Sequence, residues 1–260
     1  MKRSFLRPNA LVALGYLFVA HIGFPSVCLA APYEVTVYSD DIPEKGEAEA
    51  ELILSVAKAR PEDDGPKSRV AQGLAEYSFG IADGWAVGIE LPVARADGIS
   101  KLKGLKAEVQ YVHPHDPSSG WYWGVRSDIG YESSVYEARG GNSIDINPVI
   151  GYRYSVWHLV INPSVEIPLS GDSSKTIFKP SGEVVADVGG SNAVGLQYFG
   201  DMGPLSKILP RSHRDEMLYL VWKKKLGTRR FSVGLGQPFA ATSGNVDKWV
   251  AKAAISLELE

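Results

Sequence analysis

The sequence is poor in cysteine and, beyond its N-terminus, in long apolar runs. One cysteine in 260 residues excludes a disulfide-stabilised scaffold. A membrane-spanning helix needs roughly 18 or more consecutive apolar residues, which no stretch beyond the N-terminus approaches, so a multi-span helical membrane protein is excluded. Because 27 Lys and Arg stand against 30 Asp and Glu, we expect no nucleic-acid partner. Aromatic residues make up 10% of the chain and, with ample Val, Ile and Leu, can bury a core, so we do not expect low-complexity disorder.

The first thirty residues have the three-part form of a secretory signal peptide. Three cationic residues precede an apolar stretch over residues 10–24, and a proline break and a small-residue ending at Ala30 follow it. That stretch is short for a membrane anchor. We expect cleavage after Ala30, because cleavage one residue later would place Pro32 directly behind the scissile bond. The mature chain then begins with an N-terminal extension over residues 31–46 and lacks cysteine, since Cys28 belongs to the signal peptide.

From residue 47 onward, apolar and polar side chains alternate with a period of two, which is the signature of a strand with one apolar and one polar face. In residues 47–56, one face carries Ala, Leu and Val while the other begins with three glutamates. A helix would scatter those carboxylates around its circumference. The alternation predicts twelve strands, over residues 47–58, 69–81, 85–94, 103–113, 121–131, 143–154, 157–167, 176–188, 191–200, 216–224, 230–236 and 247–259.

The connections between these strands indicate a membrane barrel. Alternation alone is typical of both soluble and membrane barrels. The connections after even-numbered strands are short and those after odd-numbered strands are longer, which is the pattern of periplasmic turns and outer loops. We therefore expect an all-β protein, a transmembrane antiparallel up-and-down β-barrel of about twelve strands over residues 47–260. A soluble periplasmic β protein is the rival interpretation.

Aromatic residues gather at the strand ends and favour the same fold. Most lie next to the short turns on the apolar face, as in a periplasmic aromatic girdle, and a thinner set lies toward the long loops. Aromatic residues also favour strand ends in other β proteins, so the pattern is not specific. The residues expected at the membrane interface are Tyr77, Trp85, Trp121, Trp123, Tyr154, Trp157, Trp222 and Trp249.

Three parts of the chain carry a resemblance to known proteins. Residues 76–92, the pairs Asn147-Pro148 and Asn162-Pro163, and residues 194–204 resemble parts of Gram-negative outer-membrane β-barrels. The similar proteins are uncharacterised barrels and the porin-like proteins associated with phenol-degradation pathways. The resemblance implies the barrel fold and the barrel-assembly machinery as a partner, without specifying a solute. One departure is the C-terminus, which ends on Glu260 where such barrels usually finish on an aromatic residue recognised by that machinery.

If the apolar face meets lipid, the polar face lines the lumen and its charges become the candidate functional residues. The lumen-lining candidates are Glu49, Glu51, Glu76, Glu90, Lys106, Glu108, Arg126, Asp128, Asp145, Arg153, Glu166 and Lys252. Their mixed signs fit either a polar channel that selects solutes or a ladder of ion pairs that fills the interior. Closure would bring the first strand beside the last, so we predict that Glu51 approaches Lys252 across that seam, with Lys248 nearby.

Patterns for catalysis and metal binding are weak. An outer-membrane hydrolase needs a nucleophile and a base within hydrogen-bond reach. His158, Asn162 and Ser164 share one face of a strand, but successive positions on that face are roughly 7 Å apart. The turn His113-Pro114-His115-Asp116 offers three potential ligands, yet without further Cys or His nearby an ordinary turn is the better interpretation. We expect no enzymatic activity, no cofactor and no metal site.

Two further segments leave alternatives open. Residues 33–39 alternate before the barrel begins and form either a periplasmic extension or an interior plug. The longest external loop carries the basic run 211–214, which would contact lipopolysaccharide phosphates, fold inward as a constriction or stay solvated. The leading expectation is an outer-membrane channel for passive passage of a small-molecule solute, with outer-membrane lipid and lipopolysaccharide as partners. The alternative is a structural or interaction barrel with a closed lumen.

Overall fold

The computed structural model describes residues 36–58, 69–96, 98–133, 141–170, 175–239 and 249–259. The expected signal peptide, its cleavage site and Lys248 lie outside these ranges. The strands are β1 (Ala48–Lys58), β2 (Arg69–Ala82), β3 (Trp85–Ala96), β4 (Ile99–Leu102), β5 (Gly104–Val112), β6 (Gly120–Glu132), β7 (Gly141–Tyr154), β8 (Trp157–Pro168), β9 (Ile177–Gly189), β10 (Asn192–Asp201), β11 (Asp215–Leu226), β12 (Arg229–Pro238) and β13 (Val250–Leu259). A 3-10 helix, η1 (Arg211–His213), precedes β11. In these ranges, no helix is long and apolar enough to cross a membrane.

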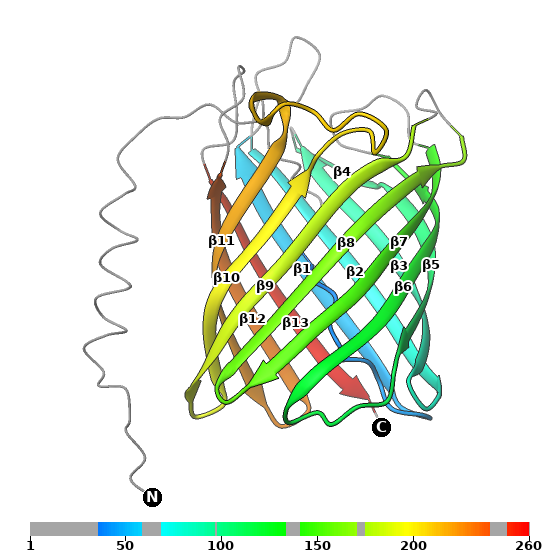
Figure 1. Ribbon diagram of the computed structural model, residues 1–260. Coiled ribbons are helices and arrows are strands. Elements are labelled where there is room, and N and C mark those ends of the chain that lie inside the picture. Colours follow the sequence, from blue (N-terminus) through cyan, green and yellow to red (C-terminus); the bar gives the residue numbers. More distant parts are fainter. Residues whose placement is uncertain are drawn as a thin grey trace, which may run out of the picture.

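Neighbouring strands pair antiparallel around a closed barrel (Figure 1). The seam is the pairing of β1 with β13, which places Ala48 opposite Leu259 and Ala57 opposite Val250. Both β4 and β5 pair with β3 and follow one another along it, so they are two parts of one barrel strand. The wall therefore has twelve strands, and the predicted fold class and strand number are confirmed.

One predicted loop is wrong, although the strand boundaries otherwise agree with the predicted ones to within three residues. The sequence predicts a loop over residues 95–102, whereas residues 99–102 form β4 and pair with the end of β3. Gly98 in the tight connection has a φ of +81°, a conformation that glycine adopts without a Cβ clash. The chain therefore folds back on β3 before it continues as β5.

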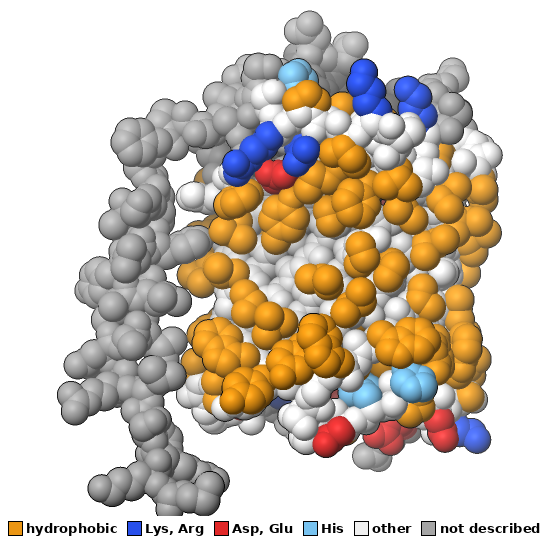
Figure 2. All heavy atoms as spheres, in the orientation of Figure 1, with side chains coloured by type: hydrophobic (Ala, Val, Ile, Leu, Met, Phe, Trp, Pro, Cys, Tyr) orange, Lys and Arg blue, Asp and Glu red, His pale blue; other side chains and the backbone are white. Residues whose placement is uncertain are grey.

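The wall has a polar inner face and an apolar outer face. On β1, Ser55 is 4% exposed while its neighbour Leu54 is 49% exposed. Figure 2 shows hydrophobic side chains over the visible wall, with charged side chains gathered toward the two rims. This inverts the pattern of a soluble protein and suits a wall that faces lipid. All eight aromatic residues expected at the membrane interface are exposed, and their level in the bilayer stays a prediction.

The N-terminal segment, residues 36–47, extends from the barrel interior, where residues 36–40 are half-buried, to the rim, where residues 44–47 are exposed. It runs beside the end of β2, where the Gly46 N–H donates to the Gly80 carbonyl oxygen at 2.8 Å. A Cβ on Gly80 would lie 2.0 Å from the Glu44 carbonyl oxygen, so this close approach requires glycine. Farther inside, Val37 packs against both apolar clusters of the interior. The sequence left a periplasmic extension and an interior plug open for residues 33–39, and the described residues 36–39 lie in the interior.

Candidate functional site

The barrel interior contains a buried arginine surrounded by carboxylates. Arg126 points inward from β6 and is 3% exposed. Its Nε donates to Asp128 Oδ1 at 2.9 Å, and one terminal nitrogen donates to Glu76 Oε1 at 3.1 Å. The other terminal nitrogen donates to Glu90 and Glu108. One guanidinium therefore joins carboxylates from β2, β3, β5 and β6.

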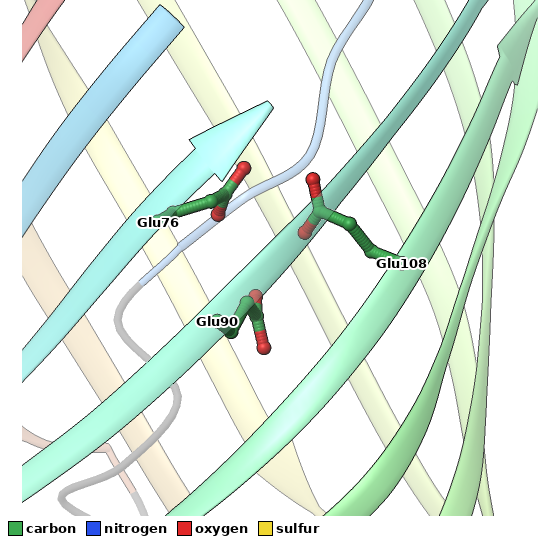
Figure 3. Close-up of side chains that lie close together, drawn as sticks. All are labelled: Glu76, Glu90 and Glu108. Atoms are coloured by element: carbon green, nitrogen blue, oxygen red, sulfur yellow. The ribbon is translucent and has the colours of Figure 1, made fainter. Parts of the chain in front are cut away.

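Three of these carboxylates, those of Glu76, Glu90 and Glu108, point toward one another from separate strands (Figure 3). Each offers an oxygen within 4.8 Å of the others, a spacing that also suits a metal ion with oxygen ligands. The guanidinium of Arg126 already contacts all three carboxylates, however, and supplies the positive charge between them. We therefore interpret the group as an ion-pair network centred on arginine.

The interior also places carboxylates directly opposite one another across neighbouring strands. The opposed pairs are Glu51 with Glu76, Glu76 with Glu90, Glu108 with Asp128, Asp128 with Asp145, and Asp145 with Glu166. Like charges in opposed positions destabilise a sheet unless cations offset them. Lys106 Nζ lies 2.9 Å from Asp145 Oδ2 and 2.5 Å from Glu132 Oε2, and Lys179 Nζ lies 2.5 Å from Glu166 Oε2. Cations from other strands thus offset part of this repulsion.

At the seam, Glu51 and Lys252 both face the interior of paired strands, but the register separates them. Glu51 is opposite Ser256, whose Oγ donates to Glu51 Oε1 at 2.9 Å. Lys252 is opposite Ser55, and its Nζ donates to Gln197. The four-residue offset along β13 corresponds to roughly 14 Å. The predicted pairing of strands is therefore confirmed, whereas the hydrogen-bond partner of Glu51 is a serine and not Lys252.

Lys252 instead lies in an apolar part of the interior. Its Nζ is 4.8 Å from the centroid of the Phe199 ring and 4.6 Å from that of Tyr219. Both rings belong to a buried cluster that also contains Met217 and Val250. Aromatic faces attract a cation, and this attraction is stronger where water is excluded. The wall formed by β10, β11 and β13 therefore differs from the carboxylate-rich wall around Arg126.

The N-terminal segment is held in the lumen through its backbone. Asn162 on β8 accepts a hydrogen bond from the Tyr38 N–H and donates one to the Tyr38 carbonyl oxygen, both at 3.0 Å. Gln110 on β5 donates to the Ser39 carbonyl oxygen at 2.9 Å. The guanidinium carbon of Arg126 lies 4.4 Å from the centroid of the Tyr38 ring. The arginine network and the N-terminal segment are thus parts of one contact.

A salt bridge fastens the same segment through Asp40. Arg153 on β7 donates to both carboxylate oxygens, and His115 Nε2 donates to Oδ2 at 2.9 Å. Burial raises the pKa of the Asp40 carboxyl, but the hydrogen bond and charge of Arg153, with the hydrogen bond of His115, outweigh it. The pKa of Asp40 is therefore below its ordinary value of 3.8, and the carboxylate is ionised at neutral pH.

The potential metal ligands in the turn over residues 113–116 do not converge on one point. The ring of His113 stacks on Trp123 with centroids 5.2 Å apart, while His115 bonds to Asp40. Asp116 Oδ1 accepts a hydrogen bond from the Ser118 N–H at 2.8 Å, and its bonds with Ser118 lower the pKa of Asp116. Each potential ligand has a separate partner, as expected of an ordinary turn.

All twelve lumen-lining candidates have their side chains on the inner side of the wall. The most buried are Glu90, Glu108, Arg126, Asp128 and Lys252, and the others are partly exposed to the lumen. The sequence left Tyr38 open as part of an interior plug, whereas Asp40 and Arg230 were not identified as interior residues. Arg230 on β12 donates to Asp41 and Glu49. The alternation of residues 33–39 was the signal for Tyr38, and the inward parity of β12 was the signal for Arg230.

Beside the N-terminal segment lies a cavity of about 530 Å³. Its walls include Ser39, Glu49, His158, Lys223 and Arg230. Charges of both signs therefore face it. The lining continues to the short turns that join β7 to β8 and β9 to β10, so the cavity reaches the end of the barrel with short turns.

The closed antiparallel wall, its apolar outer face and its polar interior define an outer-membrane β-barrel. The solved structure of the COG4313 outer membrane channel from Pseudomonas putida F1 is similar, with a TM-score of 0.61 and 10% identity over 87% of this chain and 100% of that chain. The NanC porin is similar with a TM-score of 0.54 and 13% identity over 80% and 100%. At these identities the likeness concerns the fold. No protein-family model and no curated protein matches the chain.

Proposed function

We propose that the protein is a passive, porin-like channel that conducts small solutes across the outer membrane. The observation that carries the proposal is a charged cavity of about 530 Å³ inside a closed barrel with an apolar outer face. Charges of both signs on its walls suit small polar solutes. The similar solved structures, which are a channel and a porin by name, support this function.

The N-terminal segment controls conduction in this proposal. It crosses the lumen, and its anchors at Asn162, Gln110 and Arg153 lie on three different wall strands. While these anchors hold, solutes have only the cavity beside the segment. Loosening the segment would widen the pathway without any change in the wall.

A structural or interaction barrel with a closed lumen is the second candidate, and the same segment favours it. Buried side chains around Tyr38, together with the Arg126 network, fill much of the middle of the barrel. If the segment never leaves its anchors, no wide pathway forms. The two candidates therefore differ in a single measurable property, which is ion conduction.

A catalytic role is not part of the proposal. His158 Nε2 and the Tyr122 hydroxyl oxygen are hydrogen-bonded at 2.7 Å. Ser164 Oγ donates to the Asn162 carbonyl oxygen at 3.5 Å. Within the described residues, His158 and Ser164 thus have separate partners and do not form a nucleophile and base pair.

Export by a signal peptide cleaved after Ala30, followed by insertion through the barrel-assembly machinery, completes the proposal. The three-part N-terminal sequence supports the first step, and the twelve-stranded barrel supports the second. Mass spectrometry of the protein purified from outer membranes tests the cleavage site. A mature mass that starts at Ala31 is expected.

Ion current through the purified protein in planar lipid bilayers tests the channel function. Stepwise current increases with each insertion are expected, with a small conductance because the segment occupies the lumen. The absence of current over repeated insertions, in preparations shown to be folded, would contradict a channel and favour the closed barrel.

A further inference from the structure

We propose that the loop between β10 and β11, residues 202–214, binds the phosphate groups of lipopolysaccharide in the outer leaflet. This loop stands at the end of the barrel with the long connections, which is the outer end in barrels of this class (Figure 1). It contains exposed cations and exposed apolar side chains side by side. An amphipathic lipid with a phosphorylated head group requires that combination.

The cationic side chains of the loop have N–H groups available to donate hydrogen bonds to an anion. Lys207 is exposed, and the Arg211 side chain is 65% exposed. Within the described residues, the Arg211 guanidinium makes no hydrogen bond; it lies 5.3 Å from the centroid of the Phe239 ring, and its Nε is 3.9 Å from Glu216. A guanidinium held in place with free donors suits the bidentate recognition of phosphate.

The carboxylate beneath these cations is buried, so it contacts them from the inner side of the loop. Glu216 is buried, and its oxygens lie 3.9 Å from Arg211 Nε and from an Arg214 terminal nitrogen. Arg214 also donates through Nε to the Leu209 carbonyl oxygen at 2.7 Å. Glu216 therefore anchors the inner side of the basic group, while Lys207 and Arg211 present their charge outward.

Apolar side chains continue the lipid-facing wall up to these cations. Leu205, Ile208 and Phe239 are exposed at the same end of the barrel. Figure 2 shows Lys and Arg side chains directly above the hydrophobic belt at this rim. Acyl chains would pack on the belt while the phosphates meet the cations, and this continuity favours a lipid over a soluble anion.

The loop is preorganised for this contact. Backbone hydrogen bonds close it at several points, from the Lys207 N–H to the Pro204 carbonyl oxygen and from the Leu209 N–H to that of Met202, both at 2.9 Å. The short helix η1 then sets Arg211 at its start. A fixed loop loses little conformational entropy when a ligand binds.

The test measures binding of diphosphorylated lipid A, and of the same lipid A without its phosphates, to the folded protein in detergent. The double variant K207Q/R211Q should lose about thirtyfold in affinity for the phosphorylated form, since it lacks two cations at an anionic lipid surface. Its affinity for the dephosphorylated form should stay that of the wild type. The matched control K224Q/R229Q removes one Lys and one Arg at the opposite end and should bind like the wild type.

Two results would overturn the proposal. One is equal affinity of the wild type for lipid A with and without phosphates, which would show that the loop does not recognise the phosphate groups. The other is an unchanged preference for phosphate in K207Q/R211Q. Retained heat-modifiable mobility on gels establishes that each variant is folded, so a loss of affinity is not a loss of structure.

Discussion

Arg153 on β7 donates two hydrogen bonds to Asp40, from a terminal nitrogen to Oδ1 at 2.6 Å and from Nε to Oδ2 at 3.2 Å, although 113 positions separate the two residues. This bidentate pair fixes the N-terminal segment to the wall. Charge-assisted bonds of this kind are shorter and stronger than neutral ones. Conduction should therefore depend on whether this pair is intact.

The substitution D40N should loosen the segment and raise the mean conductance at neutral pH. It removes the charge that Arg153 and His115 share, which weakens the docked state by about 1.5–3 kcal/mol. Planar-bilayer recordings measure the effect. The charge-swapped variant D40R/R153D serves as the matched control, because it restores an ion pair and should return the conductance toward that of the wild type.

Acid should have the same effect as D40N in the wild type. Because the pKa of Asp40 is lowered on folding, its stabilising contribution is present above the ordinary value of 3.8 and is lost as pH falls through the lower, folded pKa. Conductance should be constant between about pH 7 and 5 and increase below 3.8. The D40N variant should lack this step, and an identical acid response in both proteins would refute the role of Asp40.

The substitution R126Q should strongly destabilise the barrel. It leaves the carboxylates of Glu76, Glu90 and Glu108 close together without their cation. Removing one partner of a buried ion-pair network lowers the free energy of unfolding by about 3–5 kcal/mol. Urea titration in detergent measures this change. R95Q, at an exposed position on β3, is the matched control and should unfold like the wild type.

The substitution G151A should displace Tyr122. A Cβ at position 151 would lie 2.0 Å from the Tyr122 ring, so the ring must move and its hydrogen bond to His158 must break. We expect a loss of about 1–3 kcal/mol in the free energy of unfolding, measured by urea titration. In the double variant Y122A/G151A, the added methyl group should have almost no further effect, because the clash is gone. Additive losses would contradict this account.

Alternation along the chain was sufficient to predict the wall. Parity assigns Leu54 to the lipid face and Ser55 to the interior, and the same rule locates each of the twelve strands. Loop lengths then indicated which end faces the periplasm. Both signals are local, so a single sequence contains them.

Contacts across the lumen were not predictable in this way. Parity placed Glu51 and Lys252 on the inner face, but strand register decides that Glu51 meets Ser256. Register in a barrel depends on the tilt and shear of all strands together. Likewise, alternation in residues 33–39 is the same for a periplasmic strand and for an interior one. Only the closed structure brings Asp40 to Arg153.

Single-channel conductance of the mature chain shortened to begin at Glu47 tests whether the N-terminal segment controls the pathway. This variant lacks the segment that holds the anchors at Tyr38 and Asp40, while every wall strand is intact. We expect stable insertions with a conductance several times that of the full-length protein, and an intermediate conductance for D40N. Equal conductance of the shortened and full-length proteins, both folded in the same bilayer, would contradict the claim that the N-terminal segment controls the pathway.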